Sequence, residues 1–233
     1  MNVKPLGFLK ADFGNRFGIP RQSGLVPAAR AELEFKGQAV ASVEGIEEFS
    51  HLWVIFEFHL SKGKSATRET TARPPRLGGR KRVGVLATRS PFRPNPIGLS
   101  LVTLQEVRRS RGRVVLVLGG GDFVDGTPVL DIKPYLPWAD EAPGARAGWA
   151  SEPPPRVRVR WSPEAESQGQ ARLRGGYAKF KELVDQTLSL DHRPPDVAKR
   201  GGGKFASPLA GIDVHWVYED GDCVVTCLKD PRS

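Results

Sequence analysis

Hydrophobic and polar residues alternate along several short segments in the first 137 residues of the chain. Residues 31–36 (AELEFK) alternate with the period of two that places successive side chains on opposite faces of a strand. Polar residues 108–112 (RRSRG) separate two later apolar runs and predict a hairpin turn. The apolar, β-branched or aromatic runs are 51–60, 82–88, 99–107, 113–119 and 128–137. This region therefore predicts a mainly β fold, a β-barrel or β-sandwich.

The last third of the chain follows a different pattern. Residues 156–161 alternate as a strand, and apolar residues within 176–190 recur at the spacing of one amphipathic helix. Two further apolar runs, 211–218 and 223–228, flank Asp220-Gly221, a dipeptide typical of hairpins. We expect a small β-barrel domain over 1–140 and a smaller α+β module over 156–233, joined by the Pro-, Ala- and Gly-rich stretch between them.

Composition narrows the class of protein. The chain has 233 residues, enough for one domain and a smaller one, and its apolar runs exclude a disordered tail. No apolar stretch reaches 18 residues, and the N-terminus lacks the long apolar segment of a secretory signal. The two cysteines, Cys223 and Cys227, are too few for a disulfide framework. We expect a cytoplasmic, reduced protein.

Positive charge is concentrated in residues 62–93. The whole chain carries a formal charge of +9, and this window alone accounts for it, with Glu69 as its one acid. Clustered cations favour a polyanion such as nucleic acid, because binding releases condensed counterions. The alternative is a solvated loop with no partner. The basic residues are Lys62, Lys64, Arg68, Arg73, Arg76, Arg80, Lys81, Arg82, Arg89 and Arg93.

Residues 114–122 (VVLVLGGGD) resemble the nucleotide-binding turn of a doubly wound fold. That turn requires a helix immediately afterwards, whose N-terminus meets the ligand. Here Pro128, Pro134 and Pro137 follow within a short distance and disfavour a helix. We therefore interpret the glycines as a bend or bulge in a β fold.

Residues 87–100 (ATRSPFRPNPIGLS) predict a stiff loop. Pro91, Pro94 and Pro96 fix the backbone and remove donors, so neither a helix nor a central strand fits. The loop presents Arg89, Arg93 and Asn95, and guanidinium groups suit carboxylate or phosphate recognition. The alternative is that this loop is only a tight connection between strands and has no role in binding.

Further candidate residues lie in two other segments and at one strand end. Asp131, Lys133 and Tyr135 fall on one strand face by the period of two, either as a polar pocket or as a solvated outer face. Arg21 and Gln22 follow Pro20, and His59 ends an apolar run, either as a site residue or as a structural one. No cluster has metal-ligand spacing, and no covalent-catalysis motif is present.

Four segments together resemble the TsaA-like family and, within that family, the bacterial tRNA (adenine-N6)-methyltransferases. They are GIPRQSGL (18–25), EEFSHLWVIFEFH (47–59), GVLATRSPFRPNPIGLS (84–100) and DGTPVLDIKPYLPWAD (125–140). The tail segments TLSLDHRPP and GIDVHW are also similar to that family's C-terminal module. The resemblance implies a β-barrel that binds S-adenosylmethionine, a homodimer, and methylation of N6 of threonylcarbamoyladenosine beside the anticodon of threonine tRNA.

Carried over motif by motif, the resemblance also implies which residues contact S-adenosylmethionine. They are Pro20, Arg21, Gln22, His59, Leu60, Arg89, Leu99, Asp125, Gly126, Thr127 and Pro128.

The acceptor nitrogen of this substrate is weakly nucleophilic and must lose a proton near the transition state. Asn95, Asp131 and Tyr135 are our candidates for the catalytic group, and Arg93 for the substrate carboxylate. We expect the basic residues of 62–82 to bind tRNA phosphates. Two alternatives remain: a basic β-barrel that binds RNA without catalysis, and a methyltransferase with a different substrate.

Overall fold

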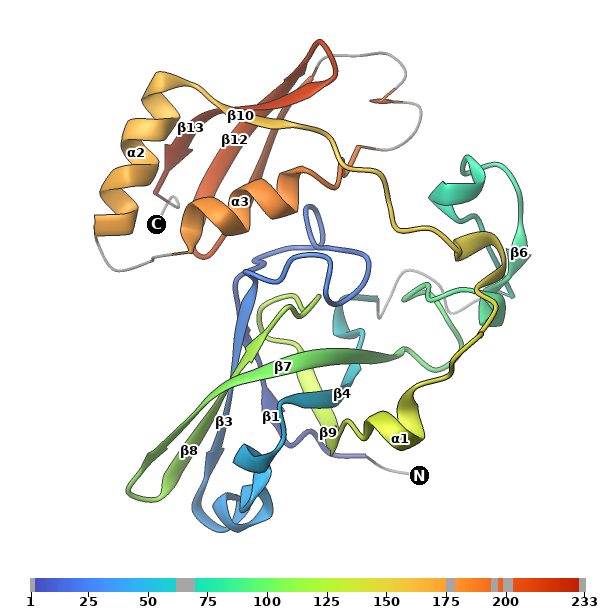
Figure 1. Cartoon of the computed structure of the whole chain (residues 1–233), viewed down its shortest axis with the longest axis vertical. Coiled ribbons are helices and arrows are strands. Elements are labelled where there is room, and N and C mark those ends of the chain that lie inside the picture. The colour runs from blue at the N-terminus through green and yellow to red at the C-terminus, as the bar shows by residue number, and fades with distance from the viewer. Residues whose placement is uncertain (1–2, 62–69, 175–178, 194–196, 199–202, 231–233) are drawn as a thin grey trace.

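The computed structural model describes residues 3–61, 70–174, 179–193, 197–198 and 203–230. Its largest element is a seven-stranded sheet with the order β1-β9-β4-β7-β8-β3-β2 (Figure 1). The strands are β1 (Gly7–Phe8), β2 (Lys10–Ala11), β3 (Arg30–Lys36), β4 (His51–Glu57), β7 (Ile97–Ser110), β8 (Arg113–Gly119) and β9 (Pro128–Pro134).

The seven-stranded sheet nearly closes on itself. Its two edge strands, β1 and β2, are separated in the chain by Leu9 alone, so the chain passes from one edge of the sheet directly to the other. Leu9 is buried in the resulting core, together with Leu33, Val54 and Leu116 from three other strands. This confirms the predicted mainly β fold and selects the barrel over the sandwich.

The period of two explains which side chains fill the barrel. Leu52, Val54 and Phe56 of β4 are buried, whereas the residues between them lie at the outer surface. β7 is long enough to pair with β4 through its first half and with β8 through its second half. A register shift between Leu104 and Glu106 accompanies this change of partner.

The C-terminal module contains a four-stranded sheet with the order β10-β13-β12-β11, in which β10 runs parallel to β13. Two helices lie beside this sheet (Figure 1). Leu183, Val184 and Leu188 of one helix pack with Trp216 and Val225 of the sheet. The elements are β10 (Val159–Trp161), α2 (Pro163–Arg174), α3 (Phe180–Leu188), β11 (Lys204–Leu209), β12 (Ile212–Glu219) and β13 (Asp222–Lys229).

Several boundaries differ from the sequence-based predictions. The helix expected over 176–190 is confirmed as α3, and residues 176–178 lie outside the described residues. The strand expected over 82–88 is wrong for most of its length, because only β6 (Val83–Gly84) pairs with β5 (Thr71–Ala72). Val85 alone is buried there, and the chain turns through a 3-10 segment instead.

The segment 138–155, expected as a linker, holds two short helical turns. One is α1 (Pro137–Asp140) and the other is the 3-10 turn Gly148–Ala150, which packs against the 3-10 turn Pro75–Leu77. Within the described part of the chain, no helix is both long and apolar enough to cross a membrane. The other 3-10 segments are Gly37–Val43, Ile46–Glu48, His59–Ser61 and Val85–Ala87.

Candidate functional site

One end of the barrel gathers most of the candidate residues, and we call it the rim. The end of β4 pairs with the start of β7, and the end of β8 pairs with the start of β3. The segments that continue from these strands therefore meet at one end of the barrel. We define the rim as residues 12–29, 58–61, 87–96 and 119–122.

Arg89 connects two parts of the rim. Its guanidinium donates a hydrogen bond to Oε1 of Gln22. From Thr88 to Pro96 the loop that carries Arg89 is irregular, as its prolines predict. Arg93 Nη1 donates to the carbonyl of Thr88 at 3.3 Å, and Thr88 Oγ1 donates to the carbonyl of Val85 at 2.7 Å. Arg93 therefore braces its own loop, while Arg89 reaches across to the loop that carries Arg21 and Gln22.

Asp122 is a rim residue that the sequence analysis missed. Ser100 Oγ donates to Asp122 Oδ1 at 2.5 Å, and Arg89 lies close enough for its charge to act on the carboxylate. Burial raises the pKa of Asp122, and the Ser100 hydrogen bond and the Arg89 charge only partly oppose that effect. The one signal in the sequence was an acid directly after a glycine run at a strand end.

We expect Asp122→Asn to stabilise the fold at neutral pH. A carboxyl whose pKa is raised by folding contributes its full stability below its unfolded pKa, and that stability is lost progressively as pH rises through the folded pKa. The amide avoids this loss, so its melting temperature should exceed that of the wild type at pH 7 and match it at low pH. Thermal melting across pH 3 to 8 measures this, and a gain independent of pH would contradict it.

His59 and Leu60 lie just beyond the end of β4, in a 3-10 turn at the rim. Arg16 Nη1 donates to the carbonyl of Leu60 at 3.2 Å and so links this turn to the 12–29 loop. The Leu60 side chain is 42% exposed, which leaves an apolar surface beside the polar rim.

The turn Asp125–Pro128 is attached to the barrel where the sheet closes. Asp125 Oδ1 accepts a hydrogen bond from the Ala11 backbone N–H at 2.9 Å, and the Gly126 N–H donates to the carbonyl of Leu9 at 2.8 Å. Asp125 and Gly126 are exposed, whereas Thr127 and Pro128 are buried. Thr127 Oγ1 donates to the carbonyl of Val124 at 2.6 Å, so this hydroxyl holds the turn together.

The outer face of the barrel carries Leu99 near the rim end of β7, and Asp131 and Tyr135 along and just after β9. Leu99 and Asp131 both lie opposite Ile55, on the two strands that flank β4. Asp131 Oδ2 pairs with Lys133 Nζ at 3.1 Å. Tyr135 lies four positions further along, roughly 13 Å at the rise of a strand, and its ring meets those of His51 and Trp53. Within one chain, Asn95 and Tyr135 are thus not brought together.

The basic window continues as a short ribbon that leads into the rim. We call residues 70–86 the basic arm. It contains β5 and β6, and it runs directly into the loop that carries Arg89. Among the described residues no arm cation pairs with a carboxylate, and Arg76 donates to the backbone carbonyl of Glu152. The exposed cations of the arm are Arg73, Arg76, Arg80, Lys81 and Arg82, and the predicted residues Lys62, Lys64 and Arg68 lie outside the described residues.

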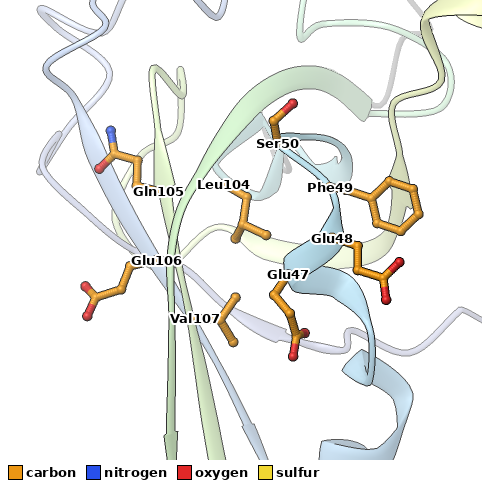
Figure 2. A pocket seen from close by; sticks show the side chains of 8 residues that line it. All are labelled: Glu47, Glu48, Phe49, Ser50, Leu104, Gln105, Glu106 and Val107. Atoms are coloured by element: carbon orange, nitrogen blue, oxygen red, sulfur yellow. The ribbon is translucent and has the colours of Figure 1, made fainter.

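A separate hollow of about 400 Å³ lies near the start of β4, at the opposite end of that strand from the rim (Figure 2). Glu47, Glu48 and Glu106 are among its lining residues. Arg109 Nη2 donates to both carboxylate oxygens of Glu47, at 3.0 and 2.9 Å. An acidic hollow repels phosphate, so it is no candidate for an RNA site. No group of His, Cys, Asp and Glu within the described residues is placed to hold a metal ion.

Comparison with known proteins identifies the family. The model of the tRNA-methyltransferase O N-terminal domain matches residues 8–141, and the model of the TrmO C-terminal domain matches residues 154–231. The chain belongs to the tRNA-methyltransferase O family. This confirms the relationship inferred from the four sequence motifs and the tail.

Individual relatives cover nearly the whole chain. A tRNA (adenine(37)-N6)-methyltransferase of Escherichia coli is 43% identical over 232 residues, which span 97% of each chain. A Pseudomonas aeruginosa protein, RcsF, whose name places it among S-adenosylmethionine-dependent methyltransferases, is 42% identical over 96% of this chain and 95% of its own. The crystal structure of TrmO from P. aeruginosa superposes with a TM-score of 0.80 at 38% identity, covering 99% of this chain and 97% of that one.

Proposed function

We propose that this chain methylates N6 of threonylcarbamoyladenosine beside the anticodon of threonine tRNA, in the cytoplasm. Family membership makes it an S-adenosylmethionine-dependent methyltransferase that acts on tRNA. The observation that supports N6 of adenine 37 as the target is the near full-length likeness to the E. coli enzyme named for it. The threonylcarbamoyl group and threonine tRNA rest on the resemblance of the four sequence motifs. The basic arm beside the rim supports an RNA substrate over a small molecule.

The rim residues fit S-adenosylmethionine by their chemistry. Arg21 and Arg89 offer guanidinium groups to a carboxylate, and exposed Leu60 offers an apolar surface to an adenine ring. The exposed turn at Asp125 and Gly126 offers polar groups to the edge of the base. When bound, the cofactor supplies an activated methyl group on a positively charged sulfur. We assign this site to a barrel domain of residues 1–140, with residues 156–233 as a second unit.

The acceptor nitrogen needs a group that polarises or removes its proton. Asn95 is on the proline-braced loop, whereas Asp131 and Tyr135 are on the outer face. A base or hydrogen-bond partner acts only within hydrogen-bonding reach of the proton, so the two locations are alternatives within one chain. Arg93 is proposed to meet the threonyl carboxylate of the substrate.

We expect Asn95→Ala, Asp131→Asn and Tyr135→Phe, made singly, to separate these alternatives. The variant that removes the polarising group should lower kcat about tenfold, the effect of one lost hydrogen bond, with the KM for S-adenosylmethionine unchanged. Steady-state kinetics with purified threonine tRNA measures this. Unchanged turnover in all three variants would remove all three residues from the chemistry.

We also propose a homodimer formed through the outer face of the barrel. Ile97 is 49% exposed and Leu99 is 55% exposed on β7, and Trp138 is 84% exposed just after β9. Exposed large apolar side chains on the outer face of a barrel favour burial against a second copy. We expect light scattering to give twice the chain mass for the wild type and 25.5 kDa for Ile97→Glu. Leu86→Glu, on the basic arm, is the control and should remain dimeric; a monomeric wild type would refute the dimer.

The substrate is tested by mass spectrometry of threonine tRNA nucleosides from a strain lacking the gene. A methylated threonylcarbamoyladenosine should be absent there and return when the gene is restored. Identical nucleosides in both strains would contradict the proposal. In that case, tRNA binding without methyl transfer favours the RNA-binding alternative, and a methyl group on another nucleoside favours a different substrate.

A further inference from the structure

The rim loop 12–29 packs against the C-terminal module, as Figure 1 shows for the segment between β2 and β3. The ring of Phe17 stacks on those of Phe205 and Trp216, with centroids 6.1 and 5.9 Å apart. Phe13 is buried in the same core cluster as these module residues. Gly18 has a φ of +90°, and a Cβ there would lie 3.2 Å from Ser207 Oγ. The loop thus fills part of the core of the module.

Three module side chains hold the loop backbone on both sides of Pro20–Gln22. On one side, Ser207 Oγ donates to the carbonyl of Phe17 at 2.7 Å. On the other side, Arg156 Nη2 donates to the carbonyl of Leu25 at 2.7 Å. The Ala28 N–H donates to Gln186 Oε1 at 2.9 Å. These bonds bracket the residues proposed to contact the cofactor.

Charge adds a fourth connection. The carboxylate of Asp191 acts attractively on Arg21, and Arg21 in turn disfavours protonation of the neighbouring His192. Asp191 is itself fixed by Arg193, whose Nε and Nη2 donate to its two oxygens at 2.8 Å each. The Arg193 guanidinium lies 3.5 Å above the centre of the Tyr218 ring.

The barrel holds the middle of the loop, whereas the module holds the residues on either side of it. The Gly24 N–H donates to the carbonyl of Gly120 at 2.8 Å, and Gln22 accepts from Arg89. A loop has many conformations, and ordering each residue costs conformational entropy. If the module already holds the loop in one conformation, this entropy cost is met before the cofactor binds. A larger fraction of molecules then presents Arg21 and Gln22 in the binding conformation.

We propose that the C-terminal module positions the cofactor-binding loop of the barrel, with Arg156, Gln186 and Ser207 as positioning residues. The inference rests on the proposed placement of S-adenosylmethionine at Arg21 and Gln22. Loss of positioning lowers the competent fraction, so the apparent cofactor affinity falls while the chemistry of the bound complex is retained.

The test is the double variant Arg156→Ala/Gln186→Ala in the full chain. Its matched control is Arg160→Ala/Gln168→Ala. Arg160 Nε donates to Asp222 at 2.8 Å and Gln168 Oε1 accepts from the Leu228 N–H at 2.6 Å, both within the module. Calorimetry gives the affinity for S-adenosylmethionine, steady-state kinetics gives KM and kcat, and thermal melting monitors the fold.

We expect the double variant to raise the Kd and KM for S-adenosylmethionine about tenfold, with kcat within about twofold of the wild type. The control should bind the cofactor as the wild type does, at a comparable melting temperature. Arg156→Lys should retain more of the affinity than Arg156→Ala, because the lysine ammonium also donates hydrogen bonds. Unchanged cofactor affinity in the double variant, or an equal loss in the control, would overturn the inference.

A second double variant, Arg21→Ala/Gln22→Ala, distinguishes the two ways of failing. If it leaves cofactor affinity unchanged, the proposed cofactor site is wrong. If it weakens affinity while Arg156→Ala/Gln186→Ala does not, the cofactor site stands and the positioning role is wrong.

Discussion

Replacing Arg89 with alanine is expected to lower kcat/KM for methyl transfer roughly 100-fold. Arg89 donates to Gln22 and lies beside the raised-pKa carboxyl of Asp122, so its loss uncouples two rim loops and removes the counter-charge of a buried acid. A hydrogen bond to a charged group contributes about 1.5–3 kcal/mol, which corresponds to about 10- to 150-fold.

Steady-state kinetics at fixed tRNA measures the Arg89 effect. Arg113→Ala is the matched control, because Arg113 forms an exposed pair with Glu34 on the hairpin strands away from the rim. The control should keep wild-type kcat/KM. Equal kinetics for Arg89→Ala and the wild type would exclude Arg89 from the site.

Reversing the charge of the basic arm is expected to raise the KM for tRNA roughly 100-fold. The variant Arg80→Glu/Lys81→Glu/Arg82→Glu replaces three exposed cations that precede the rim loop. Three lost phosphate contacts should also make the slope of log K against log salt shallower by about two to three. The kcat at saturating tRNA should change little, because the arm binds and does not react.

The control for the arm reverses three cations elsewhere: Lys36→Glu/Arg111→Glu/Arg113→Glu at the β3 end and the β7–β8 hairpin. It loses the same net charge, so it separates a local contact from the general field of the protein. If the arm variant keeps the full salt dependence of tRNA binding, the arm does not contact tRNA phosphates.

The strands of the barrel were predictable because their burial follows the period of two. Leu33 and Phe35, or Leu116 and Leu118, are visible in the sequence as alternating apolar positions. Helix α2 was not, because among its described residues only Ala165 and Gly169 are buried, which leaves no apolar stripe at helical spacing. Strand β11 contains Pro208 and lies at a sheet edge, where proline is tolerated but gives no strand signal.

The candidate site was predictable where it depends on local backbone. Prolines alone indicate that Arg89 is presented by a stiff loop. The role of Asp122 depends on the register that brings the end of β8 near Ser100, which no local pattern encodes. The position of Asp131 depends on an irregularity between Ile55 and Phe56, which shifts the pairing of β9. Contacts between the 12–29 loop and the module join residues more than 100 positions apart.

The central claim is that the rim of the barrel holds the methyl donor. A crystal structure with bound S-adenosylhomocysteine tests it most directly. We predict density for this ligand at the rim, in contact with Arg21, Gln22 or Arg89. Density at the acidic hollow by Glu47, or anywhere else away from Arg21, Gln22 and Arg89, would contradict the account.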